Sequence, residues 1–380
     1  MGVLRLILAW MVIISHSSPI FGWRGLGADA VTAFFVISGF YMALILDQKY
    51  RAAGALWLFY SNRALRLFPL YLIFLLVYLF LSVIGQPGAP VLARTVYVAE
   101  EAVKYASDGS VGSWTAVVPN LFFLGSDVIR LFLIDVGNGS FSPWRTGMAE
   151  TSELRGGYRY LVMPHIWSLG VEVVFYAIVP FLAQLRLYRL VVAFVALTIL
   201  QLCLTLWLGD LAWLHLFSLW NLSFFALGMI VYRLTPILVS SKRWLVVLLA
   251  ATPLITAVVS EGSYWTTWIP FSIGLPALFF LTKNWAFDKA VGDLSYPVYL
   301  CHFLFAWPAA AAYGQYGAVV ALVLSCALSW VALQIVDAPI ERWRARRVQL
   351  AMTDPASPAQ NISPSDRERS ATPVTRSADG

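Results

Sequence analysis

Apolar runs long enough to cross a membrane recur along the whole chain, and they constrain its fold more than any other feature. A helix of about 20 residues matches the roughly 30 Å of hydrocarbon in a bilayer. We therefore predict an all-α, polytopic membrane protein with about ten transmembrane helices. The expected spans cover residues 3–20, 29–46, 68–85, 165–184, 189–208, 213–233, 244–260, 267–282, 294–313 and 316–336.

Composition agrees with this class and excludes others. Hydrophobic residues make up 60% of the 380-residue chain and charged residues 12%, whereas about a quarter of a typical soluble domain is charged. The net charge is +6, but the basic residues lie between the apolar runs, so we expect no nucleic-acid partner. Cys203, Cys301 and Cys326 show no paired spacing, and neither a disulfide framework nor a metal site is expected.

The distribution of basic residues predicts an orientation. If the N-terminus is cytoplasmic, the outer turns near Asp210, Glu261 and Gly314 carry no Lys or Arg. An even number of spans then returns the C-terminus to the cytoplasm, which predicts a multi-pass protein of the inner (plasma) membrane. We expect a membrane domain over residues 1–345 and a disordered cytoplasmic tail over residues 346–380, which is rich in Pro, Ser and Thr.

Two segments allow another interpretation. The first run, Leu4 to Ile20, could be a cleaved signal peptide, because Arg5 supplies a positive n-region. No small-x-small cleavage site follows, so we favour an intact span. In the long outer region 86–164, polar residues interrupt the apolar stretch Val117 to Ile134. We expect this stretch to be re-entrant or to lie at the interface.

The first span places two ionisable residues on one face. Arg5 and His16 are eleven residues apart, which on an α-helix is about three turns and roughly 16 Å along the axis. One of them then lies at a membrane surface and the other in the far half. Capping of a helix end is an alternative role for His16.

Glu172 needs a partner from another helix, because an ionised residue inside a span costs a few kcal/mol and no basic residue lies within one turn of it. By the expected span boundaries, His16 lies at a comparable depth. We predict that Glu172 stands beside His16, where a carboxylate would orient the imidazole and stabilise the imidazolium form of a general base.

Arg63 and Arg66 are three residues apart, on one helical face just before the third span. Two guanidinium groups on one face suit a phosphate, which they can bind bidentately. Ordinary positive-inside anchoring is the alternative. Because Arg5 enters from the same side, we favour a phosphate-bearing ligand.

A stripe of polar residues follows one face of the ninth span. Ser295, Tyr299 and His302 are spaced at i, i+4 and i+7. Packing between membrane helices would also explain Ser295 and Tyr299, because hydroxyl residues commonly join such helices.

Five motifs in order give the chain a family resemblance over about residues 1–345. The chain resembles the acyltransferase-3 family of integral membrane O-acyltransferases, which modify bacterial surface polysaccharides, lipid-linked sugars and some secondary metabolites. Two departures are local: Asp337-Ala338-Pro339 replaces a Glu-x-Pro, and Thr32 replaces an acidic residue. The matching residues are Arg5 with His16; Gly27 with Phe34 to Phe40; Arg63 and Arg66 with Pro69 and Tyr71; Trp167 to Glu172; and Gly292 to His302.

The resemblance implies a mechanism. Acyl-CoA, by default acetyl-CoA, would dock from the cytoplasm with its phosphates on Arg63 and Arg66, together with Arg5. A sugar hydroxyl of a glycan would approach from outside, and His16, oriented by Glu172, would remove its proton or transiently carry the acyl group. The residues expected to bind or support the substrates are Trp167, Ser168, Ser295, Tyr299 and His302.

A transporter or flippase for a lipid-linked sugar is the main alternative function. Several spans with ionisable groups at the midplane would suit it. The sequence shows no internal repeat and no paired Gly- or Pro-broken helices of the kind that such folds use, so we favour the enzyme.

Overall fold

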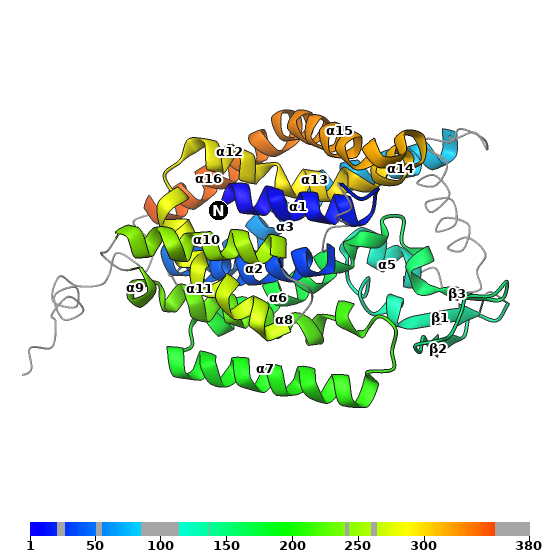
Figure 1. The fold of residues 1–380 in the computed structure, drawn as a ribbon, viewed down its shortest axis with the longest axis horizontal. Helices are drawn as coiled ribbons and strands as arrows, with labels where there is room; N and C mark the ends of the chain where they lie inside the picture. Colours follow the sequence, from blue (N-terminus) through cyan, green and yellow to red (C-terminus); the bar gives the residue numbers. More distant parts are fainter. Residues whose placement is uncertain are drawn as a thin grey trace, which may run out of the picture.

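Helices packed side by side make up most of the fold (Figure 1). The computed structural model describes residues 1–20, 27–50, 55–84, 114–135, 137–239, 243–259 and 264–353. The predicted all-α class is confirmed. The helices are α1 (Gly2–Ser15), α2 (Gly27–Lys49), α3 (Ala55–Ile84), α5 (Trp114–Phe122), α6 (Trp167–Ala183), α7 (Leu187–Leu208), α8 (Ser218–Arg233), α9 (Thr235–Leu238), α10 (Arg243–Val259), α11 (Tyr264–Thr282), α12 (Ala286–Asp293), α13 (Ser295–Cys301), α14 (Ala306–Tyr313), α15 (Gly317–Ala332) and α16 (Ala338–Thr353).

Within the described residues, five helical segments are long and apolar enough to cross a membrane, which supports a membrane protein. α1 and parts of α10 and α11 are apolar but shorter. The predicted count of about ten spans is therefore not confirmed. The five segments are Gly27–Lys49, Ala55–Ser82, Pro164–Ala183, Leu187–Leu208 and Ala306–Leu350.

The structure departs from the predicted boundaries at α3 and within the predicted span 294–313. α3 begins at Ala55 rather than at residue 68, because Leu, Ala and Arg continue the helix where hydropathy falls. The predicted span 294–313 is not one helix: α13 ends at Cys301, a 3₁₀ turn follows, and α14 begins at Ala306. Pro308 lies in the first turn of α14, where its missing N–H costs no hydrogen bond.

The segment predicted to be a disordered tail begins within a helix. α16 extends to Thr353, so residues 346–353 are helical, contrary to the prediction. Residues 354–380 lie outside the described residues. A π-helix, Leu333–Asp337, joins α15 to α16.

α2 and α8 approach each other closely at two glycines. A Cβ atom on Gly39 of α2 would collide with the carbonyl oxygen of Phe225, and one on Gly228 of α8 would collide with that of Val36. Phe35 stacks on Phe225 beside this crossing, with centroids 4.8 Å apart. The small residues let the two backbones meet, as is common between membrane helices.

A small antiparallel sheet, which the sequence analysis does not predict, follows α5. Its strand order is β2-β1-β3, formed by β1 (Phe132–Asp135), β2 (Phe141–Pro143) and β3 (Leu154–Gly156). The apolar stretch 117–134 is not a continuous helix, because α5 ends at Phe122 and a 3₁₀ turn and β1 come after it.

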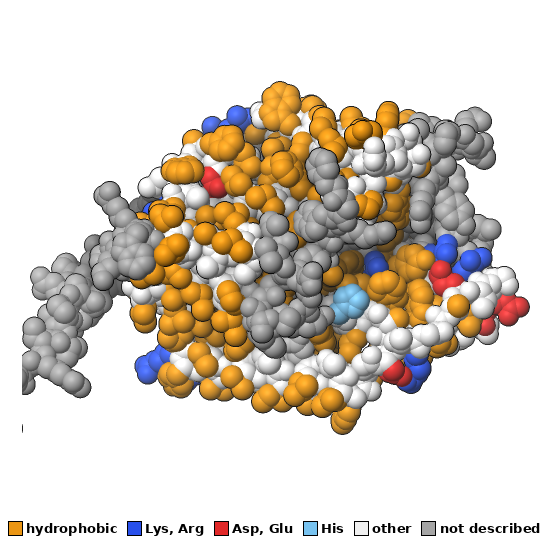
Figure 2. Space-filling view, viewed as in Figure 1, with side chains coloured by type: hydrophobic (Ala, Val, Ile, Leu, Met, Phe, Trp, Pro, Cys, Tyr) orange, Lys and Arg blue, Asp and Glu red, His pale blue; other side chains and the backbone are white. Residues whose placement is uncertain are grey.

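The two ends of the helical body carry different residues, with predicted arginines at one end and His16 at the other. In Figure 1, α1 runs from α16 and α9 at one end toward the sheet at the other. Figure 2 shows hydrophobic side chains over much of the coloured part of this face, with most of the charged side chains toward its ends. We call the end with Arg5, Arg63 and Arg66 the basic end, and the end with His16 the histidine end.

Candidate active site

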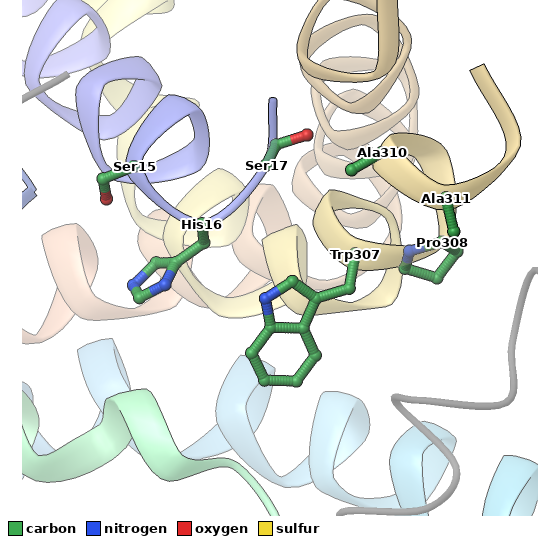
Figure 3. A pocket seen from close by; sticks show the side chains of 7 residues that line it. All are labelled: Ser15, His16, Ser17, Trp307, Pro308, Ala310 and Ala311. Carbon is green, nitrogen blue, oxygen red and sulfur yellow. The ribbon is translucent and has the colours of Figure 1, made fainter. Parts of the chain in front are cut away.

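His16 directly follows α1, which ends at Ser15. Its N–H donates to the carbonyl oxygens of Val12 and Ile13, 3.3 and 3.1 Å away, and so ends the helix. Figure 3 shows its imidazole and the indole of Trp307 beside a cavity of about 420 Å³ between this end of α1 and α14. The cavity is lined by Ser15, His16, Ser17, Trp307, Pro308, Ala310 and Ala311.

Two buried histidines adjoin His16. The ring centroids of His16 and His302 are 5.5 Å apart and stacked, and those of His165 and His302 are 4.7 Å apart at a steep angle. The ring of Phe303 lies 4.4 to 4.8 Å from all three. Three of the chain's four histidines therefore meet at one place. We call His16, His165 and His302 the histidine cluster.

Backbone carbonyl groups fix the tautomers of the two buried histidines. Nδ1–H of His302 donates to the carbonyl oxygen of Tyr299 over 2.6 Å, and Nε2–H of His165 donates to that of Leu300 over 3.2 Å. A carbonyl oxygen can only accept, so the bonded nitrogen carries the proton and the other nitrogen carries a lone pair. Nε2 of His302 and Nδ1 of His165 are thus hydrogen-bond acceptors.

Neither of these acceptor nitrogens has a partner among the described residues, although both are buried. An unsatisfied buried acceptor costs roughly 1–3 kcal/mol, so native structures retain few of them. Each of these two nitrogens can accept a hydrogen bond from a hydroxyl group or take up a proton. No group of His, Cys, Asp and Glu in the described ranges is arranged to hold a metal ion.

Tyr299 and Ser168 support the cluster. The Tyr299 hydroxyl donates to the carbonyl oxygen of His165 over 2.8 Å, and Oγ of Ser168 lies 2.6 Å from that hydroxyl. The chain of bonds ties α6 to α13 at the cluster. The structure therefore brings together four predicted site residues, His16, Ser168, Tyr299 and His302.

Glu172 is not beside His16, contrary to the prediction. It lies seven residues beyond His165, about 10 Å deeper along α6. Its carboxylate accepts hydrogen bonds from Ser38, over 3.0 Å, and from Tyr176. Its charge acts on Arg5 rather than on the histidine cluster. The error arises because α1 ends at Ser15, so that His16 lies level with the start of α6.

Two other predicted site residues lie outside the cluster. Oγ of Ser295 donates to the carbonyl oxygen of Gly292 over 2.7 Å, as expected for a residue that packs a helix junction. The indole of Trp167 contacts Phe35 edge to face, with centroids 6.2 Å apart. Neither side chain touches a histidine of the cluster among the contacts of the described residues.

Arg130 approaches the cluster from the side of the sheet. Its Nη1 donates to the carbonyl oxygen of Pro164 over 2.6 Å, and its guanidinium lies over the rings of Tyr158 and Trp213 at 5.8 and 5.4 Å. It makes no ion pair within the described part of the chain. Its positive charge acts on His16 and His165.

At the basic end, Arg5 lies close enough to Arg66 for the two charges to repel each other. Arg66 pairs with Asp337 over 3.0 Å, and Asp293 attracts both arginines. The guanidinium of Arg5 makes no hydrogen bond or ion pair among the described residues. Arg63, on the same face of α3 as Arg66, is buried and contacts the sulfur of Met42 at 3.9 Å. The three predicted arginines thus share one end, as expected.

Sequence reasoning does not assign a role to His165, Arg130 or Asp337. His165 stands two residues before Trp167 in a matched motif, but spacing within one segment does not reveal a contact with His302 on another helix. Asp337 lies at the position of the family's Glu-x-Pro, which is the one signal that could have indicated it.

Comparison with known proteins identifies the family. A family profile described as "Acyltransferase domain" matches residues 1–334. Searches of curated proteins and of solved structures return no match. Since the profile covers most of the chain, including the histidine cluster and the predicted arginines of the basic end, the chain belongs to the acyltransferase-3 family and is a membrane acyltransferase.

Proposed function

We propose that this chain moves an acyl group, by default acetyl, from acyl-CoA to a hydroxyl group of a sugar in a surface polysaccharide or lipid-linked glycan. The observation that carries the proposal is the layout of α1, which has Arg5 near one end and His16 at the other. We place the basic end and both termini at the cytoplasmic side of the inner membrane, where acyl-CoA is available.

The donor binds at the basic end. Among the described residues, the guanidinium of Arg5 has no hydrogen-bond partner and Arg63 pairs with no carboxylate, so a phosphate group would supply the missing negative charge. The pantetheine arm is narrow and uncharged, and it would run along α1 toward His16. Glu172, which is held by Ser38 and Tyr176, carries a charge that attracts Arg5.

The acceptor binds at the histidine end, in the cavity beside His16. His16 removes the proton from the sugar hydroxyl while the hydroxyl oxygen attacks the thioester carbonyl carbon. The C–S bond breaks, and the CoA thiolate leaves and takes up a proton. The lone pairs of His165 and His302 can hold the acceptor hydroxyl or receive the proton from His16.

Acetyl-CoA turnover by purified protein tests this function. Full-length protein in detergent, given labelled acetyl-CoA and glycan from a strain that lacks the enzyme, should transfer label to the glycan and release CoA. His16→Ala should abolish transfer without loss of folded protein, whereas the matched change His215→Ala, outside the cluster, should keep it. Transfer that persists in His16→Ala contradicts the mechanism.

The flippase alternative gives a different result in the same experiment. A flippase would move a lipid-linked sugar across a proteoliposome membrane without consuming acetyl-CoA. Label on the glycan therefore supports the enzyme, and sugar translocation without CoA release supports the flippase.

A further inference from the structure

α16 packs on α3 and brings two more arginines to the basic end. Arg347 donates from Nη2 to Oγ of Ser61 over 2.8 Å and from Nη1 to Oδ1 of Asn62 over 3.1 Å. These bonds attach the helix next to Arg63. Arg344, one turn earlier on α16, lies close enough to Arg63 for their charges to repel each other.

The two positive charges of Arg63 and Arg344 have one carboxylate partner among the described residues, Glu341, which pairs with Arg344. Both residues are buried, with 9% and 8% of their surface exposed. Nε of each is buried without a hydrogen-bond partner among the described residues. Arg63 pairs with no carboxylate in the described part of the chain, and Glu341, the partner of Arg344, is 53% exposed on its side chain. A buried charge is stable only when it is paired, so this site lacks an anion.

The arginines form two layers along α3. Arg66 lies one turn deeper than Arg63, about 4.5 Å along the axis, and it belongs with Arg5 and Asp337. Asp337 ends the π-helix Leu333–Asp337, a wide turn of the kind often found at functional sites. From there α16 runs outward, so that Arg344 lies level with Arg63. The layer of Arg5 and Arg66 is therefore nearer to His16 than the layer of Arg63 and Arg344.

We propose that Arg63 and Arg344 bind the 3′-phosphate of acyl-CoA, while Arg5 and Arg66 bind its pyrophosphate. This inference rests on the donor named in the proposed function. In CoA the pyrophosphate joins the pantetheine arm directly, and the 3′-phosphate lies on the ribose, farther from the thioester. The deeper layer thus meets the pyrophosphate and the outer layer meets the 3′-phosphate.

The proposal gives α16 a function in donor selection. A ligand that lacks the 3′-phosphate leaves Arg63 and Arg344 without an anion, so the protein should bind CoA more tightly than 3′-dephospho-CoA. One charge-assisted contact to a phosphate corresponds to a difference of about tenfold to a hundredfold in affinity.

Affinities for three probes test the proposal on purified full-length protein in detergent. CoA, 3′-dephospho-CoA and adenosine 3′,5′-bisphosphate are titrated against wild type, Arg344→Gln and Arg63→Gln. The matched control is Arg346→Gln, which removes an exposed arginine from the same helix. Thermal unfolding and gel filtration verify that each variant is folded, and Arg63→Gln serves if Arg344→Gln does not fold.

Wild type should bind CoA at least about tenfold more tightly than 3′-dephospho-CoA. In Arg344→Gln and Arg63→Gln this ratio should fall to about one, with the affinity for 3′-dephospho-CoA unchanged, while Arg346→Gln keeps the wild-type ratio. Equal wild-type affinities, or an unchanged ratio in both variants, overturn the inference and leave the proposed function intact. Failure of wild type to bind any of the three probes overturns the proposed donor itself.

Discussion

The imidazoles of His16 and His302 stack with centroids 5.5 Å apart, although His16 lines a cavity and His302 is fully buried. The ring of His16, which lines the cavity, can meet a substrate, and Nε2 of the buried His302 ring has no partner among the described residues. Nδ1 of His165 is a second buried nitrogen without a partner in the described part of the chain. The cluster therefore joins one accessible imidazole to two proton acceptors whose tautomers are fixed.

Removing only the free nitrogen of a buried histidine should slow acyl transfer. His302→Asn places an amide near Nδ1, and His165→Gln places one near Nε2, so each keeps its bond to a carbonyl oxygen and loses the lone pair. We expect the rate of acetyl transfer to fall by about a hundredfold or more. The rate is measured as CoA release in the presence of the glycan acceptor.

Interchanging the two amides at these positions distinguishes an effect on the reaction from an effect on folding. His302→Gln and His165→Asn place the amide at the wrong ring position and should also weaken the fold, which a lower unfolding temperature would show. Wild-type rates in both His302→Asn and His165→Gln would mean that these nitrogens take no part in the reaction.

The sequence predicts single residues of this site better than the contacts between them. His16, Tyr299 and His302 are found from spacing along single helices, because residues on one face recur at fixed intervals. The contact between His165 and His302 joins different helices, and no spacing rule reports it. Glu172 is misplaced for a related reason: hydropathy extends the first span to residue 20, whereas α1 ends at Ser15.

Glu172→Gln should leave the pH dependence of acyl transfer unchanged. The carboxylate contacts Ser38 and Tyr176 and lies about 10 Å beyond His165, so it does not set the protonation of the cluster. The amide oxygen can still accept the bond from Ser38, and we expect less than a tenfold loss of rate. Rates from pH 5 to 9 provide the test. A pH profile shifted from that of wild type would place Glu172 in contact with the base during turnover.

For the fold, as for the site, the sequence predicts features that are set within one long segment and misses those that are not. Apolar runs predict the helices because burial in a bilayer depends on the composition of each run. The strands β1, β2 and β3 have three or four residues each, too few for an alternating pattern to be recognised. The break at His302 is also invisible to hydropathy, since the residues on both sides are apolar.

Gly39→Ala should destabilise the protein. The added methyl group would collide with the carbonyl oxygen of Phe225, and neither backbone can move without separating α2 from α8. Overpacking of this kind costs about 1–3 kcal/mol. Thermal unfolding in detergent measures the loss. Gly137→Ala adds the same methyl group beside Asp135 in an exposed loop and should change the unfolding temperature little. Equal effects of the two changes would contradict the close approach.

Glu150 makes the stability of the sheet region depend on pH. Its carboxylate accepts from Nε and Nη2 of Arg159, over 2.8 and 2.9 Å, and from the N–H of Gly156 over 2.6 Å. Burial opposes the charge, but the Arg159 guanidinium and this N–H outweigh it and hold the pKa of Glu150 below its ordinary value. The ionised form therefore stabilises the folded state above the unfolded pKa of about 4.3.

This stabilisation should disappear as the pH falls through the lowered pKa. Glu150→Gln should reduce the stability of residues 150–159 by about 1–2 kcal/mol at pH 7, because the charge-assisted bonds to Arg159 are lost. Hydrogen exchange of this segment, followed by mass spectrometry at pH 7 and at pH 4, measures local opening. The gap between wild type and Glu150→Gln should begin to shrink at pH 4, just below the unfolded pKa of about 4.3, and should close once the pH falls below the lowered pKa, where folded wild type loses the same charge. A gap of equal size at both pH values would show that lost packing, rather than lost charge, weakens the variant.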